Sequence, residues 1–243
     1  MRLLVVNPNT TSSMTEKIGK AARSAAGQGT EIIAANPESG PVSIEGYYDE
    51  VFAIPGLIAE MQRAGEVDAT IIACFDDTGL DAARSFSAAP VVGIGEAAFH
   101  MGSLVAGKFS VVTTLSRSIP ALEHNLVRYG LISRCARVRA AEVAVLDLEI
   151  PGSPARERIS REIARAVDED RAEAIVLGCA GMADLAAELS REHGLPVIDG
   201  VVAAVKLAEA LVSLGLKTSK RGGYATPRAK AFTGVFAPFS PAD

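Results

Sequence analysis

Two stretches of the sequence share one pattern: Ala69–Gly79 reads ATIIACFDDTG, and Ala174–Met182 reads AIVLGCAGM. In each stretch, a short apolar run typical of a buried strand ends at a cysteine, and small or acidic residues then lead into a helical pattern. Cys74 and Cys179 therefore occupy equivalent positions. We expect each of them at the end of a strand.

The equivalence extends along most of the chain. The matched segments are Val5–Pro8 with Val111–Thr114, Cys74 with Cys179, and Pro90–Val92 with Pro196–Ile198, which lie 106, 105 and 106 positions apart (111 − 5, 179 − 74 and 196 − 90). A nearly constant separation indicates two copies of one unit. Each copy alternates strands and helices, as expected of a parallel sheet flanked by helices.

We therefore predict an α/β protein with two pseudo-symmetric, flavodoxin-like parallel-sheet domains. The first would comprise residues 1–97 together with 201–243, with the last helix packing back on it, and the second residues 98–200. The length of 243 residues suffices for two domains of roughly 100 residues each. Ligands of parallel sheets bind beyond the carboxyl ends of the strands. The two thiols are expected on opposite walls of one cleft between the domains.

Composition narrows the class of partner. A formal net charge of −5 offers no basic stripe for nucleic acid, and no apolar run approaches the length of a membrane span. Met1–Thr11 contains an apolar run too short for a signal peptide. Three cysteines, an odd count, suit free thiols in a reducing compartment. We expect a cytoplasmic protein that binds a small molecule and neither nucleic acid nor membrane.

Four segments require separate predictions. Asn36–Tyr48 is a Pro/Gly/Ser-rich loop of a length typical of binding loops or lids. Pro55 is expected to open the helix that follows, because proline is tolerated in a first turn. Cys135 falls in a predicted connector, at no strand end, and is interpreted as an ordinary thiol. The segment from Lys217 onward is expected to hang loose or to contact a neighbouring subunit.

A thiolate and a thiol on opposite faces of a carbon can remove a proton from one side and return one to the other, which inverts the centre without a cofactor. A helix N-terminus favours the thiolate. Asp76 and Asp77 raise the thiol pKa of Cys74 unless they point elsewhere or cap the helix. We expect Asp77 or Thr78 to be that cap.

Other readings are weaker. A single cysteine at a strand end is usually a small buried residue, but two at matched positions are harder to explain by packing alone. All three histidines fall on predicted helices or helix ends, which disfavours a Cys–His hydrolase. Cys-x-x-Cys and Gly-x-Gly-x-x-Gly spacings are absent from the sequence. We therefore expect no metal and no cofactor. Asn7 is either a plain turn residue or an amide side chain at the cleft.

Several motifs together resemble the hydantoin racemases of the aspartate/glutamate racemase superfamily, and allantoin racemase is similar almost throughout. The motifs are Asn7–Thr10, Gly40–Gly46, Ala73–Leu80, Thr113–Leu115, Leu177–Met182 and Pro196–Gly200. The resemblance implies cofactor-independent racemisation of 5-substituted hydantoins, with Cys74 and Cys179 as the acid/base pair. It also implies a homo-oligomer and a set of substrate-binding residues: Asn7, Ser43, Ile44, Phe75, Thr113, Thr114 and Gly181.

Two alternatives stay open. Allantoin is the first, although Phe75, Ile44 and Val42 look apolar and favour alkyl or aryl substituents over a ureido group. The second is a ligand-binding protein on a racemase scaffold, with inert cysteines. The amino-acid racemases of the superfamily match less well, because they carry an acidic residue where Asn7 stands here.

Overall fold

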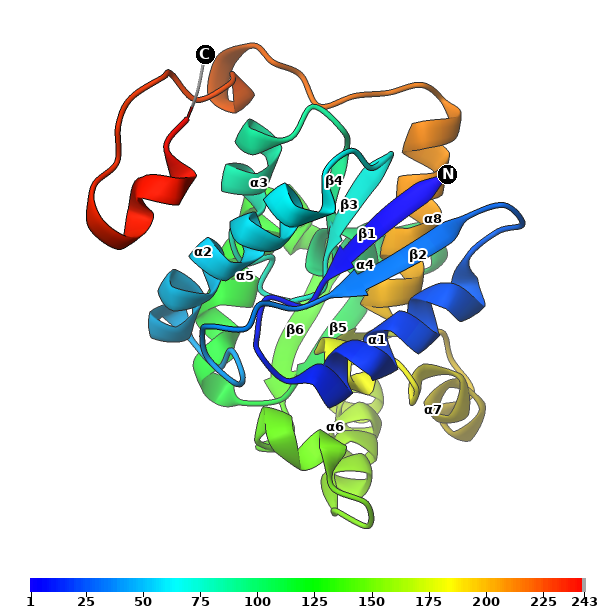
Figure 1. Ribbon diagram of the computed structural model, residues 1–243. Helices are drawn as coiled ribbons and strands as arrows, with labels where there is room; N and C mark the ends of the chain where they lie inside the picture. The colour runs from blue at the N-terminus through cyan, green and yellow to red at the C-terminus, as the bar shows by residue number, and fades with distance from the viewer. Residues whose placement is uncertain (242–243) are drawn as a thin grey trace.

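The computed structural model describes residues 1–241, which form two four-stranded parallel sheets with helices around them (Figure 1). The first sheet contains β1 (Arg2–Val6), β2 (Glu31–Ala35), β3 (Ala69–Ile72) and β4 (Val91–Gly93). The second contains β5 (Phe109–Thr113), β6 (Cys135–Ala140), β7 (Ala174–Gly178) and β8 (Val197–Ile198). Their orders, β2-β1-β3-β4 and β6-β5-β7-β8, are the same. The predicted α/β fold with an internal repeat is confirmed.

Eight α-helices alternate with or follow these strands within residues 1–241. They are α1 (Ser12–Ala25), α2 (Tyr47–Ala64), α3 (Leu80–Phe86), α4 (Ile94–Val105), α5 (Ile119–Arg128), α6 (Ala155–Asp170), α7 (Ala186–His193) and α8 (Gly200–Ser213). Apolar side chains of α2 and α3 cover the outer face of the first sheet, and those of α6 and α7 cover the outer face of the second. Each sheet is thus buried on both sides, as parallel sheets require.

The strand sequences show why both faces are buried. In β1, Leu3 and Val5 point into the core that the two sheets share, whereas Leu4 and Val6 point towards α2 and α3. Successive strand residues face opposite sides, so an unbroken apolar run serves two cores at once.

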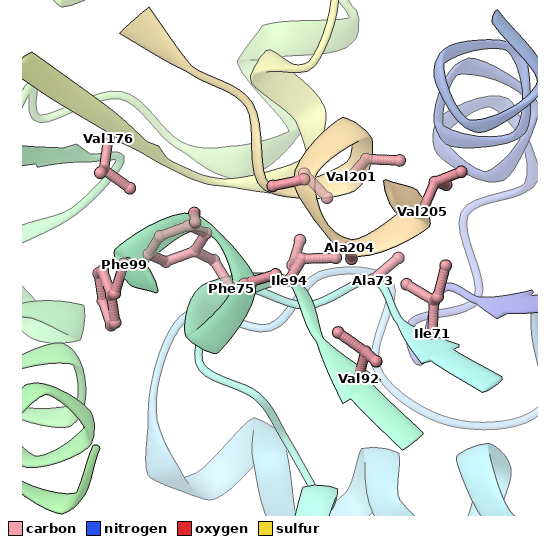
Figure 2. Packing of buried hydrophobic residues seen from close by; sticks show 14 of the residues in the cluster. Ile71, Ala73, Phe75, Val92, Ile94, Phe99, Val176, Val201, Ala204 and Val205 are labelled. Atoms are coloured by element: carbon pink, nitrogen blue, oxygen red, sulfur yellow. The ribbon is translucent and has the colours of Figure 1, made fainter. Parts of the chain in front are cut away.

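The shared core runs continuously through both repeats. Figure 2 shows residues of α8 packed beside residues of β3 and β4, with Phe75 and Phe99 at the same core. Helix α8 contacts α4, α1 and the strands β3 and β4 of the first sheet. The division into domains at residues 97 and 200 stays a prediction.

Helix α2 begins earlier than predicted. It starts at Tyr47 and contains Pro55 in its interior, whereas the sequence pattern predicts a helix that begins at Pro55. Proline leaves the carbonyl four residues before it without a helical partner. That residue is Val51, which is 63% exposed, so water can solvate the free carbonyl. The expected loop therefore ends at Gly46.

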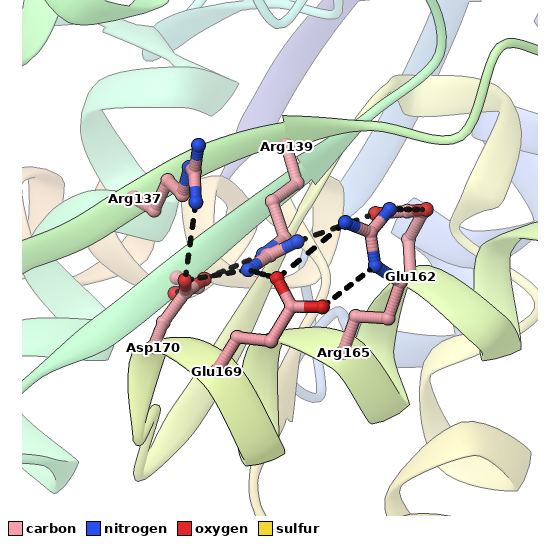
Figure 3. Close-up of polar contacts among 7 residues, drawn as sticks. Arg137, Arg139, Glu162, Arg165, Glu169 and Asp170 are labelled. Carbon is pink, nitrogen blue, oxygen red and sulfur yellow. Dashed lines mark hydrogen bonds and ion pairs between the residues drawn. The ribbon is translucent and has the colours of Figure 1, made fainter.

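Cys135 is the first residue of β6 and is buried, so the prediction of a connector here is wrong. The arginines of this strand make it look like a polar loop in sequence. In the structure, Arg139 is buried against the end of α6, where it donates to both carboxylate oxygens of Asp170 at 2.6 Å and to Glu169 at 2.7 Å (Figure 3). These ion pairs explain how an arginine occupies a strand position.

The tail begins by packing on its own chain. The Thr218 amide donates to the Ala88 carbonyl at 3.0 Å, and the Tyr224 hydroxyl donates to Asp81 at 3.0 Å. Farther on, Phe232 and Phe236 line a groove beside α2 and α3. The first part of the tail is therefore not loose, and contact with a neighbouring subunit stays a prediction. Within residues 1–241, no helix is both long and apolar enough to span a bilayer.

Candidate active site

Cys74 and Cys179 lie just beyond the carboxyl ends of β3 and β7 and line one cavity. Both thiols are free and partly buried. The cavity has a volume of about 30 Å³, which is below the range of small-molecule sites, so its walls must move apart to admit a ring-sized ligand. Its lining is Asn7, Asn9, Met14, Ile44, Ala73, Cys74, Phe75, Asp76, Thr113, Thr114, Ser118, Val145, Gly178, Cys179 and Ala180.

The first wall is held by the turn after β1. The Ala73 amide donates to the Val6 carbonyl at 2.8 Å, which places the residues after β3 beside those after β1. Asn7 Nδ2 donates to Asn9 Oδ1 at 2.8 Å and to Thr15 Oγ1 at 3.0 Å. Asn7 therefore combines the two roles considered for it: it lines the cavity, and its amide hydrogens hold the turn.

The second wall repeats this arrangement after β5. Thr113 Oγ1 donates to the Gly178 carbonyl at 3.0 Å, directly before Cys179. The Thr114 carbonyl accepts from the Val143 amide at 3.0 Å, so hydrogen bonds fix the positions of both threonines. Ser118 lines the cavity beside them.

The long loop before α2 closes one side. The Thr10 amide donates to the Pro41 carbonyl at 3.0 Å, and Thr11 Oγ1 donates to the Val42 carbonyl at 2.7 Å. These bonds hold Ile44 over the cavity, where it is only 8% exposed. Val42 is 57% exposed and absent from the lining, so its expected place in the substrate pocket is wrong.

Three other expected residues are placed differently from one another relative to the cavity. Phe75 reaches the cavity but also packs edge-on against Phe99, with 5.4 Å between ring centroids. Ser43 and Gly181 are not among the lining residues. Gly181 acts behind Cys179 instead, because its backbone amide donates to the thiol sulfur and lowers the pKa of that thiol.

The sequence predictions missed several lining residues: Asn9, Met14, Ser118, Val145, Asp76 and the small residues Ala73, Gly178 and Ala180. Asn9 and Asp76 stand two residues after Asn7 and Cys74, respectively. Their closeness to the strand ends could have predicted that they line the cavity. Val145 comes from the segment after β6, which no motif marked.

Both thiols are poorly acidic in the closed cavity. Burial raises the pKa of Cys74 well above its usual value, and the negative charge of Asp76 raises it further. Burial also raises the pKa of Cys179 to about 12; Asp76 adds to this, and the cation of Lys17 opposes it. Burial and the neighbouring Glu50 raise the pKa of Asp76 to about 7. The environments of the two cysteines are therefore different despite the repeat.

Asp77 has a structural role distinct from that of its neighbour. Its carboxylate accepts from the backbone amides of Gly95 at 2.9 Å and Glu96 at 2.8 Å, at the start of α4. The expectation that Asp77 or Thr78 caps the helix after Cys74 is therefore wrong, because Asp77 caps a different helix. The Thr78 hydroxyl donates to Cys74 Sγ at 3.3 Å and lowers the pKa of that thiol.

Residues 3–208 match the family described as Asp/Glu/Hydantoin racemase. The chain belongs to this family. It is 48% identical to the hydantoin racemase of Pseudomonas sp. strain NS671 over 98% of this chain and 97% of that protein. Its structure is similar to that of the allantoin racemase from Klebsiella pneumoniae, with a TM-score of 0.96, 48% identity and full coverage of both chains. The protein is therefore a racemase, an isomerase.

A more distant protein shares the fold of this racemase. A glutamate racemase from Bacillus anthracis has a TM-score of 0.63 at 16% identity, covering 89% of this chain and 83% of that one, which shows a shared fold only. Among residues 1–241, no group of three or more His, Cys, Asp or Glu side chains is arranged to hold a metal ion.

Proposed function

We propose that this racemase interconverts the enantiomers of a 5-substituted hydantoin, with Cys74 and Cys179 exchanging protons at C5 from opposite faces of the ring. The observation that carries the proposal is that two equivalent strand ends bring two free thiols to one small cavity. A two-base reaction needs one acid and one base on either side of the carbon.

The chemistry of the ring suits this cavity. The C5 proton lies next to a ring carbonyl, so its removal leaves an enolate whose oxygen needs hydrogen-bond donors. The hydroxyls of Thr114 and Ser118 line the cavity and can serve as such donors. The ring carries no carboxylate, which agrees with a lining that contains no lysine or arginine.

The lining also bears on the substituent at C5. Met14, Ile44 and Val145 give part of the wall an apolar surface, which favours alkyl or aryl groups. Asn9 and Ser118 favour the competing substrate, allantoin, because they can pair with its ureido group. The named relatives support both readings, since a hydantoin racemase and an allantoin racemase are each 48% identical to this chain.

The decisive measurement follows loss of optical rotation by one enantiomer of 5-isopropylhydantoin, and in parallel of allantoin, in heavy water. Wild type should racemise one of them with uptake of deuterium at C5. Cys74→Ser and Cys179→Ser should each lose about 10³-fold or more in racemisation, the scale of general acid–base catalysis. Cys135→Ala, which removes a buried thiol outside the cavity, should keep most of the activity.

Each single-cysteine variant should still exchange the C5 proton of one enantiomer, because the remaining thiol can return deuterium to the face from which it took the proton. The enantiomer that exchanges then identifies the face each cysteine serves. Activity that survives in Cys74→Ser would contradict the two-thiol mechanism. No activity on either substrate, together with thiols unreactive towards iodoacetamide, would leave the ligand-binding scaffold.

A further inference from the structure

Asp76 and Asp77 are adjacent acidic residues that differ in the hydrogen bonding of their carboxyl groups. Asp77 accepts three hydrogen bonds, from Gly95, Glu96 and the Tyr129 hydroxyl. In the part of the chain that the structure describes, the Asp76 carboxyl makes no hydrogen bond or ion pair. Its backbone is fixed, because the Asp76 carbonyl accepts from Asn125 Nδ2 at 2.9 Å. Asp76 thus presents a free carboxyl to the cavity that holds both thiols.

The groups facing Asp76 are mostly acidic. The negative charges of Glu50 of α2 and of Asp77 raise the pKa of the Asp76 carboxyl. The charge of Asp76 in turn raises the pKa of both Cys74 and Cys179. Glu50 also raises the pKa of Cys74, while Glu45 raises and Lys17 lowers the pKa of Cys179. Glu50 Oε1 is buried and has no hydrogen-bond partner within residues 1–241. A second buried carboxylate beside Asp76 makes it costly for all these groups to be ionised together.

We propose that Asp76 is the third proton-carrying group of this site: its carboxylate holds the negative charge at rest, accepts the proton of whichever thiol becomes the base, and then donates a hydrogen bond to the carbonyl oxygen of the substrate. This proposal rests on the proposed function, because it names a further catalytic residue for the same reaction.

The cycle balances in protons and charge. A proton moves from the thiol of Cys74 to Asp76, and the resulting thiolate takes the C5 proton, which leaves the electron pair on the substrate as an enolate. The Cys179 thiol then protonates the opposite face of C5 and becomes a thiolate. Asp76 returns its proton to that thiolate, so both thiols and the carboxylate are restored. The opposite enantiomer uses the same steps with the cysteines exchanged.

Electrostatic coupling explains why the charge rests on Asp76. Its pKa, raised by burial to about 7, lies below that of Cys179, raised by burial to about 12, so the first proton to leave the cluster comes from Asp76. The reactive form, with one thiolate and a neutral Asp76, carries the same number of protons as the resting form. Its population therefore rises with pH only until Asp76 has ionised, near pH 7.

The test compares kcat/KM against pH for wild type, Asp76→Asn, Asp76→Ala and the control Asp77→Asn. The wild-type value should level off near pH 7, and Asp77→Asn should also level off, at a somewhat lower pH because the charge of Asp77 raises the pKa of Asp76. In Asp76→Asn it should continue to rise towards the ionisation of the thiols, because the cavity then has no Asp76 carboxylate to accept the thiol proton. Asp76→Ala should be about 10²-fold slower than Asp76→Asn at every pH, since alanine lacks the donor that the amide supplies.

A second readout does not depend on turnover. Loss of the negative neighbour lowers the thiol pKa values, so iodoacetamide should alkylate Asp76→Asn faster than wild type at pH 8, by about tenfold for each unit of decrease. The proposal would be overturned if kcat/KM of Asp76→Asn levels off at the same pH as that of wild type, or if Asp76→Ala is as fast as Asp76→Asn. An unchanged alkylation rate would also overturn it. If wild type racemises neither substrate, the proposed function fails and takes this role with it, whereas active wild type with an unshifted profile removes only the role of Asp76.

Discussion

The Tyr129 hydroxyl donates a 2.7 Å hydrogen bond to the Asp77 carboxylate, which joins the loop after β3 to the residue that follows helix α5. Asp77 has a φ of 53°, a left-handed conformation that few residues other than glycine adopt. The same carboxylate caps α4 through Gly95 and Glu96. One side chain therefore ties the Cys74 loop to both repeats.

Tyr129→Phe tests this tie. Burial raises the pKa of Asp77 to about 7, and the Tyr129 hydrogen bond opposes that rise. Because the folded pKa lies above the unfolded value near 4, the contribution of Asp77 to stability falls as pH rises through this range. Tyr129→Phe removes a hydrogen bond to Asp77, whose carboxyl is ionised at pH 8 and neutral at pH 5. Urea unfolding should show that the substitution lowers the free energy of unfolding by about 2 kcal/mol at pH 8 and by less at pH 5. Tyr47→Phe, at an exposed hydroxyl, is the control, and equal losses of Tyr129→Phe at the two pH values would contradict this.

Lys17 should affect one cysteine only. Its Nζ lies 3.0 Å from Glu149 and donates to the Gly181 carbonyl at 3.4 Å, so it reaches from α1 to the turn that carries Cys179. Its positive charge opposes the rise in the pKa of Cys179. In Lys17→Met, iodoacetamide should alkylate Cys179 several-fold more slowly and Cys74 at the wild-type rate, as measured by mass mapping of peptides. Lys20→Met, on the exposed side of the same helix, should change neither rate.

Gly95 has no room for a side chain. An added Cβ would lie 2.3 Å from the Phe75 carbonyl oxygen and 2.9 Å from Asp77 Oδ2. Gly95→Ala should therefore lower the free energy of unfolding by about 3 kcal/mol and reduce racemisation, because the backbone beside Cys74 must shift. Gly223→Ala, where an added Cβ meets nothing within 4 Å, should leave both unchanged. Chemical unfolding and the racemisation assay measure the two effects, and similar stabilities of the two variants would rule out this steric account.

Arg139 should matter for stability and not for catalysis. Its side chain is 4% exposed and pairs with the equally buried Asp170, outside the cavity lining. Burial alone raises the pKa of Asp170, but hydrogen bonds from Arg139 and Ser110 lower it overall, so this stabilisation is lost as pH falls below about 4. Arg139→Met should lower the free energy of unfolding at pH 7 by about 3 kcal/mol, and adding Asp170→Asn should recover part of the loss. The exposed Arg165→Met is the control, and a loss in Arg139→Met that persists unchanged at pH 3 would refute the ion-pair explanation.

The sequence by itself determined the fold class and the pairing of Cys74 with Cys179. Both follow from short-range patterns: apolar runs of strand length, punctuated by turn residues, that recur at a constant separation. Parallel strands place their carboxyl ends on one edge, which explains why Asn7 lies near the cysteines, whereas Thr113 and Thr114 were expected there from the family resemblance.

Only the tertiary structure decided which of two adjacent carboxyls faces the cavity. Asp77 turns away because Gly95 and Tyr129, distant in sequence, satisfy its carboxylate, and this leaves Asp76 beside the thiols. The contact of Lys17 with Gly181 spans 164 positions and likewise has no local signal. Strand and helix patterns report neighbours along the chain, whereas the charges that set a thiol pKa act through space between segments that meet only in the folded protein.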